Sequence, residues 1–142
     1  MTIKDRISAR LKKLLEYNSV LERFSDITIE ELKNDDKRSI IERNLHLACE
    51  VVIDVANLLN SEFRLPPEES SKGSIISLGK AKVLDPEFAN KLSDLAPFRN
   101  VLVHDYLEID YNIVVDVMNN KLNDFRLFAK KIAEFLQTSP TN

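Results

Sequence analysis

The sequence predicts an all-α protein, an up-and-down bundle of four long helices with short helices between the second and the last. Apolar residues recur at spacings of three and four along most of the 142-residue chain. Only two glycines and five prolines interrupt it, and the 44% hydrophobic and 30% charged content is typical of soluble helical proteins. We expect a single domain over residues 1–137, followed by a polar tail over residues 138–142.

The first half of the chain predicts two long helices joined by a short turn. An amphipathic pattern runs from Ile3 to about Phe24. Thr28-Ile29-Glu30-Glu31 matches a capping box for a short helical turn, and Asn34-Asp35-Asp36 offers the next cap. Lys37 to about Phe63 contains no proline or glycine and has a wide apolar face, which predicts the longest and most central helix.

The middle of the chain predicts a loop and then a short helix. Residues Arg64 to Ser74 are rich in turn formers, and two consecutive prolines, Pro66 and Pro67, cannot continue a helix. Ser74 can cap a short helix that runs to about Val83.

The second half predicts two more helices, the first with a discontinuity. Asp85-Pro86 is a cap followed by proline at the first helical position, which predicts a helix from Pro86 to Ala96. Pro97 is expected to kink or restart that helix, so that Arg99 to Tyr106 begins just after a break. Asp110 can cap a last helix that ends near Leu136.

Composition limits the chemistry. The single cysteine, Cys49, excludes an internal disulfide. Two histidines and one cysteine are too few for a Cys/His zinc site, and no carboxylate motif has metal-ligand spacing, so we expect neither metal nor cofactor.

The N-terminus lacks the apolar core of a signal peptide, and no apolar run approaches the roughly 20 residues of a membrane span. A cytoplasmic protein without membrane contact is expected, and its net charge of -3 disfavours broad nucleic-acid coating.

One polar segment has side chains that can transfer protons and bind a phosphate. Arg99, four intervening residues, His104, one residue and Tyr106 form an R-x4-H-x-Y pattern, with Asn100 directly after the arginine. At about 100° per residue, Arg99 and Tyr106 fall within about 20° of each other on a helix. Histidine, with a reference pKa of about 6.5, can act as base or acid, and arginine can hold the charge of a pentavalent phosphate.

This pattern resembles the signature of HepT-type toxins of the HEPN ribonuclease superfamily. The helix from Glu42 to Ala56 and the segment Leu-Asn-Asp-Phe-Arg-Leu-Phe-Ala ending at Ala129 are also similar to that family. The resemblance covers nearly the whole chain.

The resemblance implies the toxin of a toxin–antitoxin system, an endoribonuclease that acts on tRNA or mRNA. It implies a homodimer with a composite site at the interface, where Arg99 and His104 are catalytic and Asn100 supports them or binds RNA. Two copies would also supply the two imidazoles that an acid and a base require. A 2′,3′-cyclic phosphate product is expected. The partner would be a small nucleotidyltransferase (MNT-domain) antitoxin that transfers AMP to Tyr106 and so blocks phosphate entry.

Other interpretations remain open. The chain could be a non-catalytic RNA- or nucleotide-binding helical module that assembles with a nucleotidyltransferase. The motif could also be structural, with Arg99 paired with a nearby carboxylate and Tyr106 only packed. Asn100 could act as a simple cap. His46 and Cys49 lie three residues apart but are too few to bind a metal, so Cys49 is assigned to the core and His46 to a structural role.

Overall fold

The computed structural model describes residues 1–65, 70–104 and 109–138, without the side chains of Val103 and His104. That part of the chain is helical and contains no strand, which confirms the predicted all-α class. The elements are α1 (Ile3–Glu22), the 3-10 helix η1 (Glu31–Lys33), α2 (Asp35–Glu62), α3 (Ser71–Lys80), α4 (Pro86–Leu92), α5 (Leu95–His104), α6 (Tyr111–Asn120) and α7 (Leu122–Thr138).

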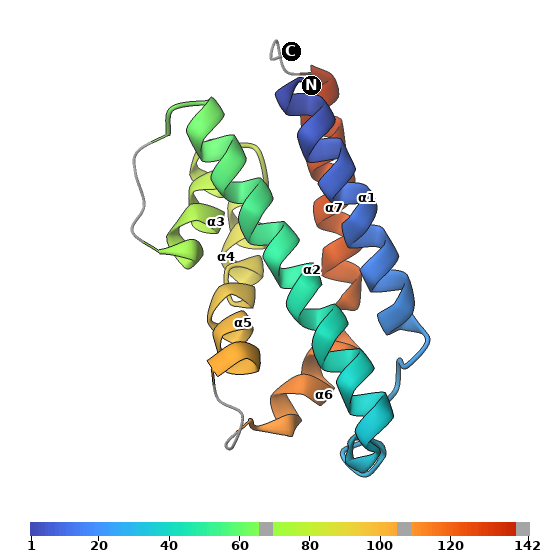
Figure 1. The fold of residues 1–142 in the computed structure, drawn as a ribbon. Coiled ribbons are helices and arrows are strands. Elements are labelled where there is room, and N and C mark those ends of the chain that lie inside the picture. The colour runs from blue at the N-terminus through green and yellow to red at the C-terminus, as the bar shows by residue number, and fades with distance from the viewer. Residues whose placement is uncertain (66–69, 105–108, 139–142) are drawn as a thin grey trace.

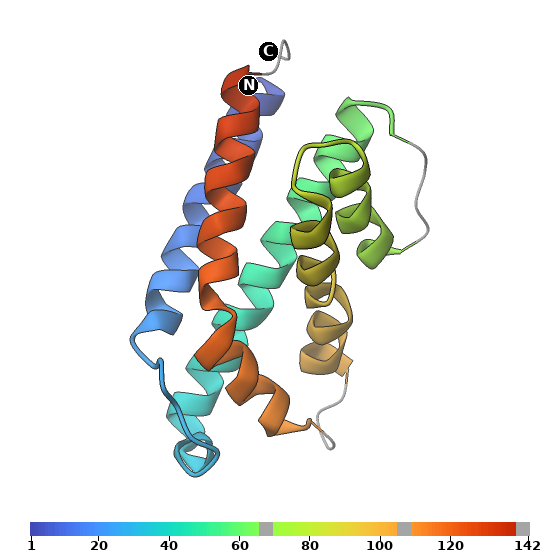
Figure 2. The same ribbon diagram turned by 180° about the vertical axis from the view of Figure 1, so that it is seen from behind.

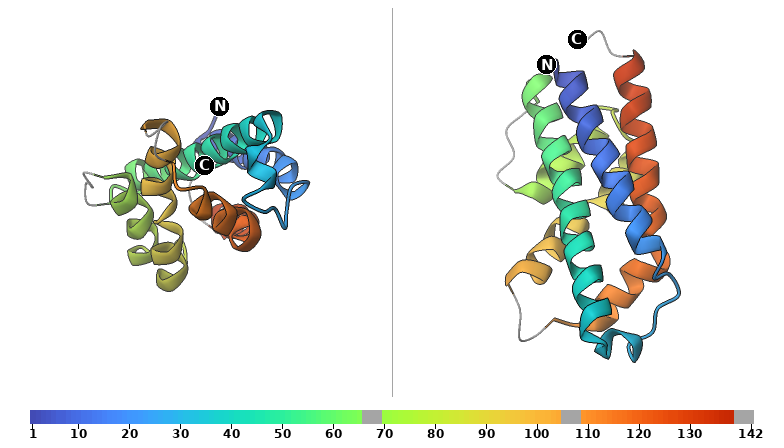
Figure 3. Two further views of the ribbon diagram at one scale, coloured as in Figure 1. Left: turned by 90° about the horizontal axis from the view of Figure 1, so that it is seen from below. Right: turned by 45° about the vertical axis from the view of Figure 1, so that its right-hand side comes forward.

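Helix α2 is the centre of the arrangement. It packs against α1 and α7 on one side and against α3 and α5 on the other (Figure 1). The view from behind shows α7 alongside α1, with α3, α4 and α5 forming a second group across α2 (Figure 2). The start of α1 and the end of α7 lie at the same end of the bundle, and α6 crosses the opposite end at an angle to α7 (Figure 3).

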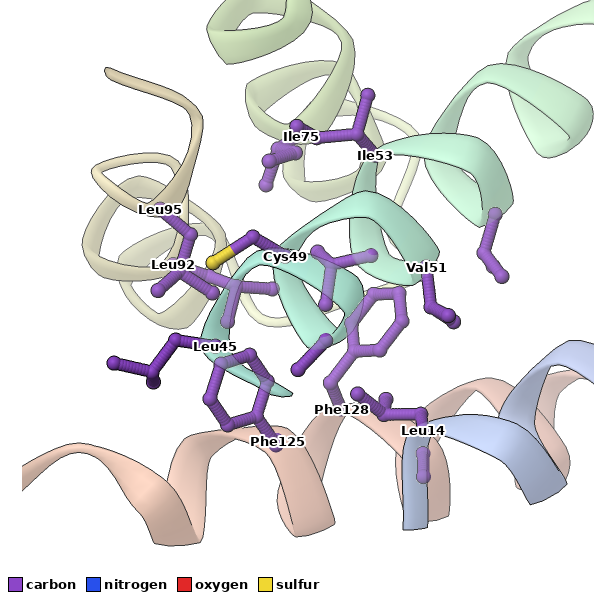
Figure 4. Packing of buried hydrophobic residues seen from close by; sticks show 14 of the residues in the cluster. Leu14, Leu45, Cys49, Val51, Ile53, Ile75, Leu92, Leu95, Phe125 and Phe128 are labelled. Carbon is purple, nitrogen blue, oxygen red and sulfur yellow. The ribbon is translucent and has the colours of Figure 1, made fainter. Parts of the chain in front are cut away.

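The core lies where α1, α2 and α7 meet and continues under α3 to α5. Phe125 and Phe128 of α7 are fully buried and point towards α2, where Leu45 and Cys49 lie (Figure 4). Cys49 is therefore a core residue, as the sequence predicts. Burial of such side chains is the main stabilising contribution to a bundle of this size.

The predicted caps are present. The Thr28 hydroxyl accepts from the Glu31 N–H at 3.2 Å, and the Glu31 carboxylate accepts from the Thr28 N–H, which completes the capping box before η1. Asn34 caps α2 by accepting from the Lys37 N–H at 2.9 Å. Asp85 caps α4 ahead of Pro86. Each cap satisfies N–H groups that a helix start leaves without partners.

The start of α3 differs from the prediction. The sequence places the cap at Ser74, whereas the structure places it at Ser70, whose hydroxyl accepts from the Gly73 N–H at 3.0 Å. Ser74 is instead a buried residue within α3. Ser70 is the N-cap because its backbone is extended and its hydroxyl can accept from the N–H three residues ahead, which has no partner within the helix.

The predicted break at Pro97 is also wrong in position. Helix α4 ends at Leu92, and α5 begins at Leu95, before the proline. Pro97 is the third residue of α5, where N–H groups have no partner within the helix, so its missing donor costs nothing there. Arg99 consequently lies inside a regular helix, not at its entrance.

The predicted last helix is in fact two helices. Asp110 does cap α6, accepting from the Asn112 N–H at 2.9 Å, but Lys121 separates α6 from α7. Asn119, near the end of α6, hydrogen-bonds to both the N–H and the carbonyl of Ile27. This long-range tie fixes the end of α6 against the loop after α1, and the chain turns there.

The last helix ends close to the expected Leu136, since α7 continues to Thr138. Residues 139–142 lie outside the described part. None of the described helices is long and apolar enough to cross a membrane.

Candidate functional site

Arg99 lies on α5 where that helix packs against α2. Its Nη1 donates to the Oε1 of Glu50 at 2.5 Å, and its Nε donates to the Oδ1 of Asn100 at 3.0 Å. The Arg99 side chain is 22% exposed and that of Glu50 33% exposed. Among the described residues no group hydrogen-bonds to Nη2.

Helix α2 presents a polar stripe to this arginine. His46, Glu50 and Asp54 are spaced by four residues and so share one face of the helix. The Nε2 of His46 lies 3.7 Å from Oε1 of Glu50, the same oxygen that accepts from Arg99. Glu50 is therefore the common partner of a guanidinium and an imidazole.

The charges around this stripe act on one another. Partial desolvation raises the pKa of Asp54, and the neighbouring Glu50 carboxylate raises it further, while Arg10 and Arg99 act in the opposite direction. Burial raises the pKa of the Cys49 thiol to about 12, and Arg99 opposes that rise. The influence of Arg99 on both groups places its charge against α2.

Asn100 is exposed and forms part of a hollow beside Arg99. The hollow is lined by Ser70, Ser71, Lys72, Ala96, Pro97 and Asn100. Lys72, which lines it, donates to Oδ1 of Asp94 at 2.8 Å. Residues from the start of α3 and from α5 thus line a surface depression, which Asn100 connects to Arg99 through its hydrogen bond.

The four residues predicted from the sequence have different outcomes. Arg99 and Asn100 lie together, joined by a hydrogen bond. His104 is the last residue of α5, with its side chain outside the description, and Tyr106 lies outside the described residues. Within the described part of the chain, no group of three or more His, Cys, Asp or Glu could hold a metal ion.

Two residues of this site, Glu50 and His46, are absent from the sequence-based set. They lie about fifty positions before Arg99, and nothing local links them to it. A signal was present nonetheless, because His46, Glu50 and Asp54 interrupt the otherwise apolar stretch from Leu45 to Ala56 at intervals of four. Such a stripe on a central helix indicates a polar surface opposite another element.

Similarity to known proteins extends over most of the chain. Residues 14–132 match the family model described as ribonuclease HepT-like. A tRNA nuclease HepT from Aphanizomenon flos-aquae is 29% identical over 133 residues, covering 93% of this chain and 90% of that protein. An mRNA nuclease HepT from Shewanella oneidensis is 35% identical over 85 residues, covering 60% of this chain and 64% of that protein.

A solved structure, described as a tri-AMPylated Shewanella oneidensis HEPN toxin in complex with MNT antitoxin, has the same fold. It superposes with a TM-score of 0.79 at 26% identity, over 90% of this chain and 96% of the other. The family match spans most of the bundle, including α2 and α5, which carry the polar site. The chain belongs to the HepT-like ribonuclease family, as the pattern around Arg99 predicts.

Proposed function

We propose that this chain is the toxin of a toxin–antitoxin pair and a metal-independent endoribonuclease. The observation that carries the proposal is the Arg99 guanidinium, held by Glu50 and Asn100 while its Nη2 has no partner among the described residues. With Nε and Nη1 held in place, Nη2 would be positioned to donate to a phosphate oxygen, and little side-chain entropy would be lost on binding. The relatives named as tRNA and mRNA nucleases support RNA as the substrate class.

The proposed reaction uses side chains alone. His104 takes the proton of the ribose 2′-hydroxyl, and the resulting oxygen attacks the adjacent phosphorus. Arg99 stabilises the charge of the pentavalent phosphate, which is the part of the path where charge builds up. The products are a 2′,3′-cyclic phosphate and a 5′-hydroxyl end. The hollow beside Asn100, with Lys72 at its edge, is the proposed path of the neighbouring nucleotides.

A second copy of the chain and an antitoxin are the proposed partners, in the cytoplasm. The homodimer would join two sites of this kind at one interface, as the family resemblance implies. The solved toxin that is tri-AMPylated and bound to an MNT antitoxin supports modification as the means of silencing. Tyr106 is the proposed acceptor, because AMP added two residues after His104 would place an anion where the phosphate of RNA has to bind.

The test is RNA cleavage by the purified protein in EDTA. Wild type is expected to cleave, and His104→Ala is expected to lose cleavage in the test tube and growth arrest in cells while it keeps its helical circular dichroism. Arg126→Gln is the matched control, because it removes an arginine paired with Glu22 on the far side of α2. Retention of cleavage by His104→Ala would contradict the proposal.

One observation favours a second candidate. The Arg99–Glu50 pair is also what a purely structural arginine would make. In that case the chain would be a non-catalytic RNA- or nucleotide-binding module that assembles with a nucleotidyltransferase. That module would bind RNA in EDTA without cutting it, so the same experiment separates the two candidates.

A further inference from the structure

His46 is a second imidazole at the site. It lies on α2 one turn before Glu50, and its Nε2 is 3.7 Å from the carboxylate oxygen that also accepts from Nη1 of Arg99 at 2.5 Å. Since the two distances share one oxygen, the imidazole and guanidinium nitrogens are no more than about 6 Å apart. The His46 side chain is 38% exposed, so it is open to solvent and to a ligand.

One phosphate group can contact both side chains. An N–H···O hydrogen bond spans about 2.9 Å, so the oxygens of a phosphodiester between two donors at this separation can reach each of them. Arg99 would hold the non-bridging oxygens, and His46 would face a bridging oxygen. The contact between His46 and Glu50 is an ion pair only when the imidazole is protonated, which is the form that gives a proton away.

A structural role alone explains little about this histidine. An exposed ion pair between residues four apart on a helix contributes about 0.3 to 0.5 kcal/mol. The imidazole fills no core position. Its defining feature is its place beside the Glu50 oxygen that positions Arg99.

We propose that His46 is a catalytic residue, the general acid that protonates the leaving 5′-oxygen. The step rests on the proposed ribonuclease function. His104 removes the 2′-hydroxyl proton, the 2′-oxygen–phosphorus bond forms, the phosphorus–5′-oxygen bond breaks, and His46 supplies the proton to the departing oxygen. The protein as a whole takes up one proton and releases one, so each turnover needs only proton exchange with water to reset the two imidazoles.

This assignment changes what the second copy of the chain has to provide. With His46 beside Arg99 of its own chain, each half of the proposed dimer already holds an acid next to its phosphate-binding arginine. The second copy then does not have to supply the acid, and the base, His104, can come from either copy of the proposed dimer.

The test compares His46→Ala and His46→Gln with wild type on two substrates. One is an RNA containing a single cleavable linkage, and the other carries sulfur in place of the 5′-bridging oxygen of that linkage. A thiolate leaves without protonation, because thiols are far more acidic than alcohols. We expect both variants to lose about 10²- to 10⁴-fold on normal RNA and to cleave the sulfur substrate at a rate close to that of wild type.

Other results would overturn the assignment. Equal losses on both substrates would mean that His46 acts as the base or only as a structural residue, and unchanged cleavage of normal RNA would remove it from the reaction. His104→Ala is the matched control and is expected to lose activity on both substrates. If His46→Ala does not fold, His46→Gln still separates these outcomes. Failure of wild type to cleave either substrate would instead contradict the proposed function itself.

Discussion

Replacement of Glu50 by alanine is expected to lower the turnover of RNA by displacing Arg99. Glu50 fixes Nη1 at 2.5 Å, whereas Asn100, the other partner, lies on the same helix as the arginine and cannot hold it against α2. A displacement of about 1 Å in a catalytic group can cost about 10²-fold in rate. We therefore predict about a 100-fold fall in kcat, which corresponds to about 2.7 kcal/mol of transition-state stabilisation.

The stability cost of the same change is smaller. The side chains of Arg99 and Glu50 are 22% and 33% exposed, so this ion pair is partly buried. Fully exposed ion pairs contribute up to about 1 kcal/mol, and disruption of a buried pair costs about 3 to 5 kcal/mol. After allowance for solvent screening, we expect a loss of about 1 to 2 kcal/mol in the free energy of unfolding.

The assay is the initial rate of cleavage of a fluorescent RNA in EDTA, measured over a range of RNA concentrations. Loss of the carboxylate leaves a positive charge unpaired, so KM should stay constant or fall while kcat drops. Glu22→Ala is the matched control, since it removes the ion pair with Arg126 between α1 and α7 without touching the site. A wild-type kcat for Glu50→Ala, or an equal loss for Glu22→Ala, would refute the positioning role.

Three further predictions concern the fold. Phe128→Ala should lower the free energy of unfolding by about 3 to 5 kcal/mol in urea titrations, since the ring is fully buried; a loss below 1 kcal/mol would contradict its core position. Asn119→Ala should cost about 1 to 3 kcal/mol by leaving Ile27 without its partners, whereas Asn120→Ala, which loses only an exposed bond, should cost far less. Burial raises the pKa of the Cys49 thiol to about 12, so this thiol should stay neutral and resist a thiol reagent at pH 8 until the protein unfolds; rapid labelling of the folded protein would contradict its burial. For the same reason the free energy of unfolding should fall as pH rises from about 9 towards 12.

The sequence predicts most of the fold because the signals that set it are local. The caps at Thr28, Asn34 and Asp85 each depend on a side chain and an N–H three residues ahead. The end of α6 could not be predicted in this way. It depends on Asn119 meeting Ile27, 92 positions earlier in the chain, and no local pattern encodes that contact.

The candidate site divides in the same manner. Arg99 and Asn100 belong to one contiguous pattern and are visible in the sequence. Glu50 and His46 join them only because α2 packs against α5. The carboxylate that the sequence leaves open as a structural partner of Arg99 is real, and the structure shows that it also contacts an imidazole. The Arg99–Glu50 ion pair does not conflict with the proposed catalytic role of Arg99, because Glu50 holds the guanidinium through only one of its nitrogens.

The most direct test of the central claim is cleavage of RNA by the purified chain in EDTA, with mass spectrometry of the new ends. We predict 2′,3′-cyclic phosphate and 5′-hydroxyl ends from wild type and no new ends from Arg99→Gln, with both proteins folded. Intact RNA after incubation with folded wild type, or equal cleavage by Arg99→Gln, would contradict it.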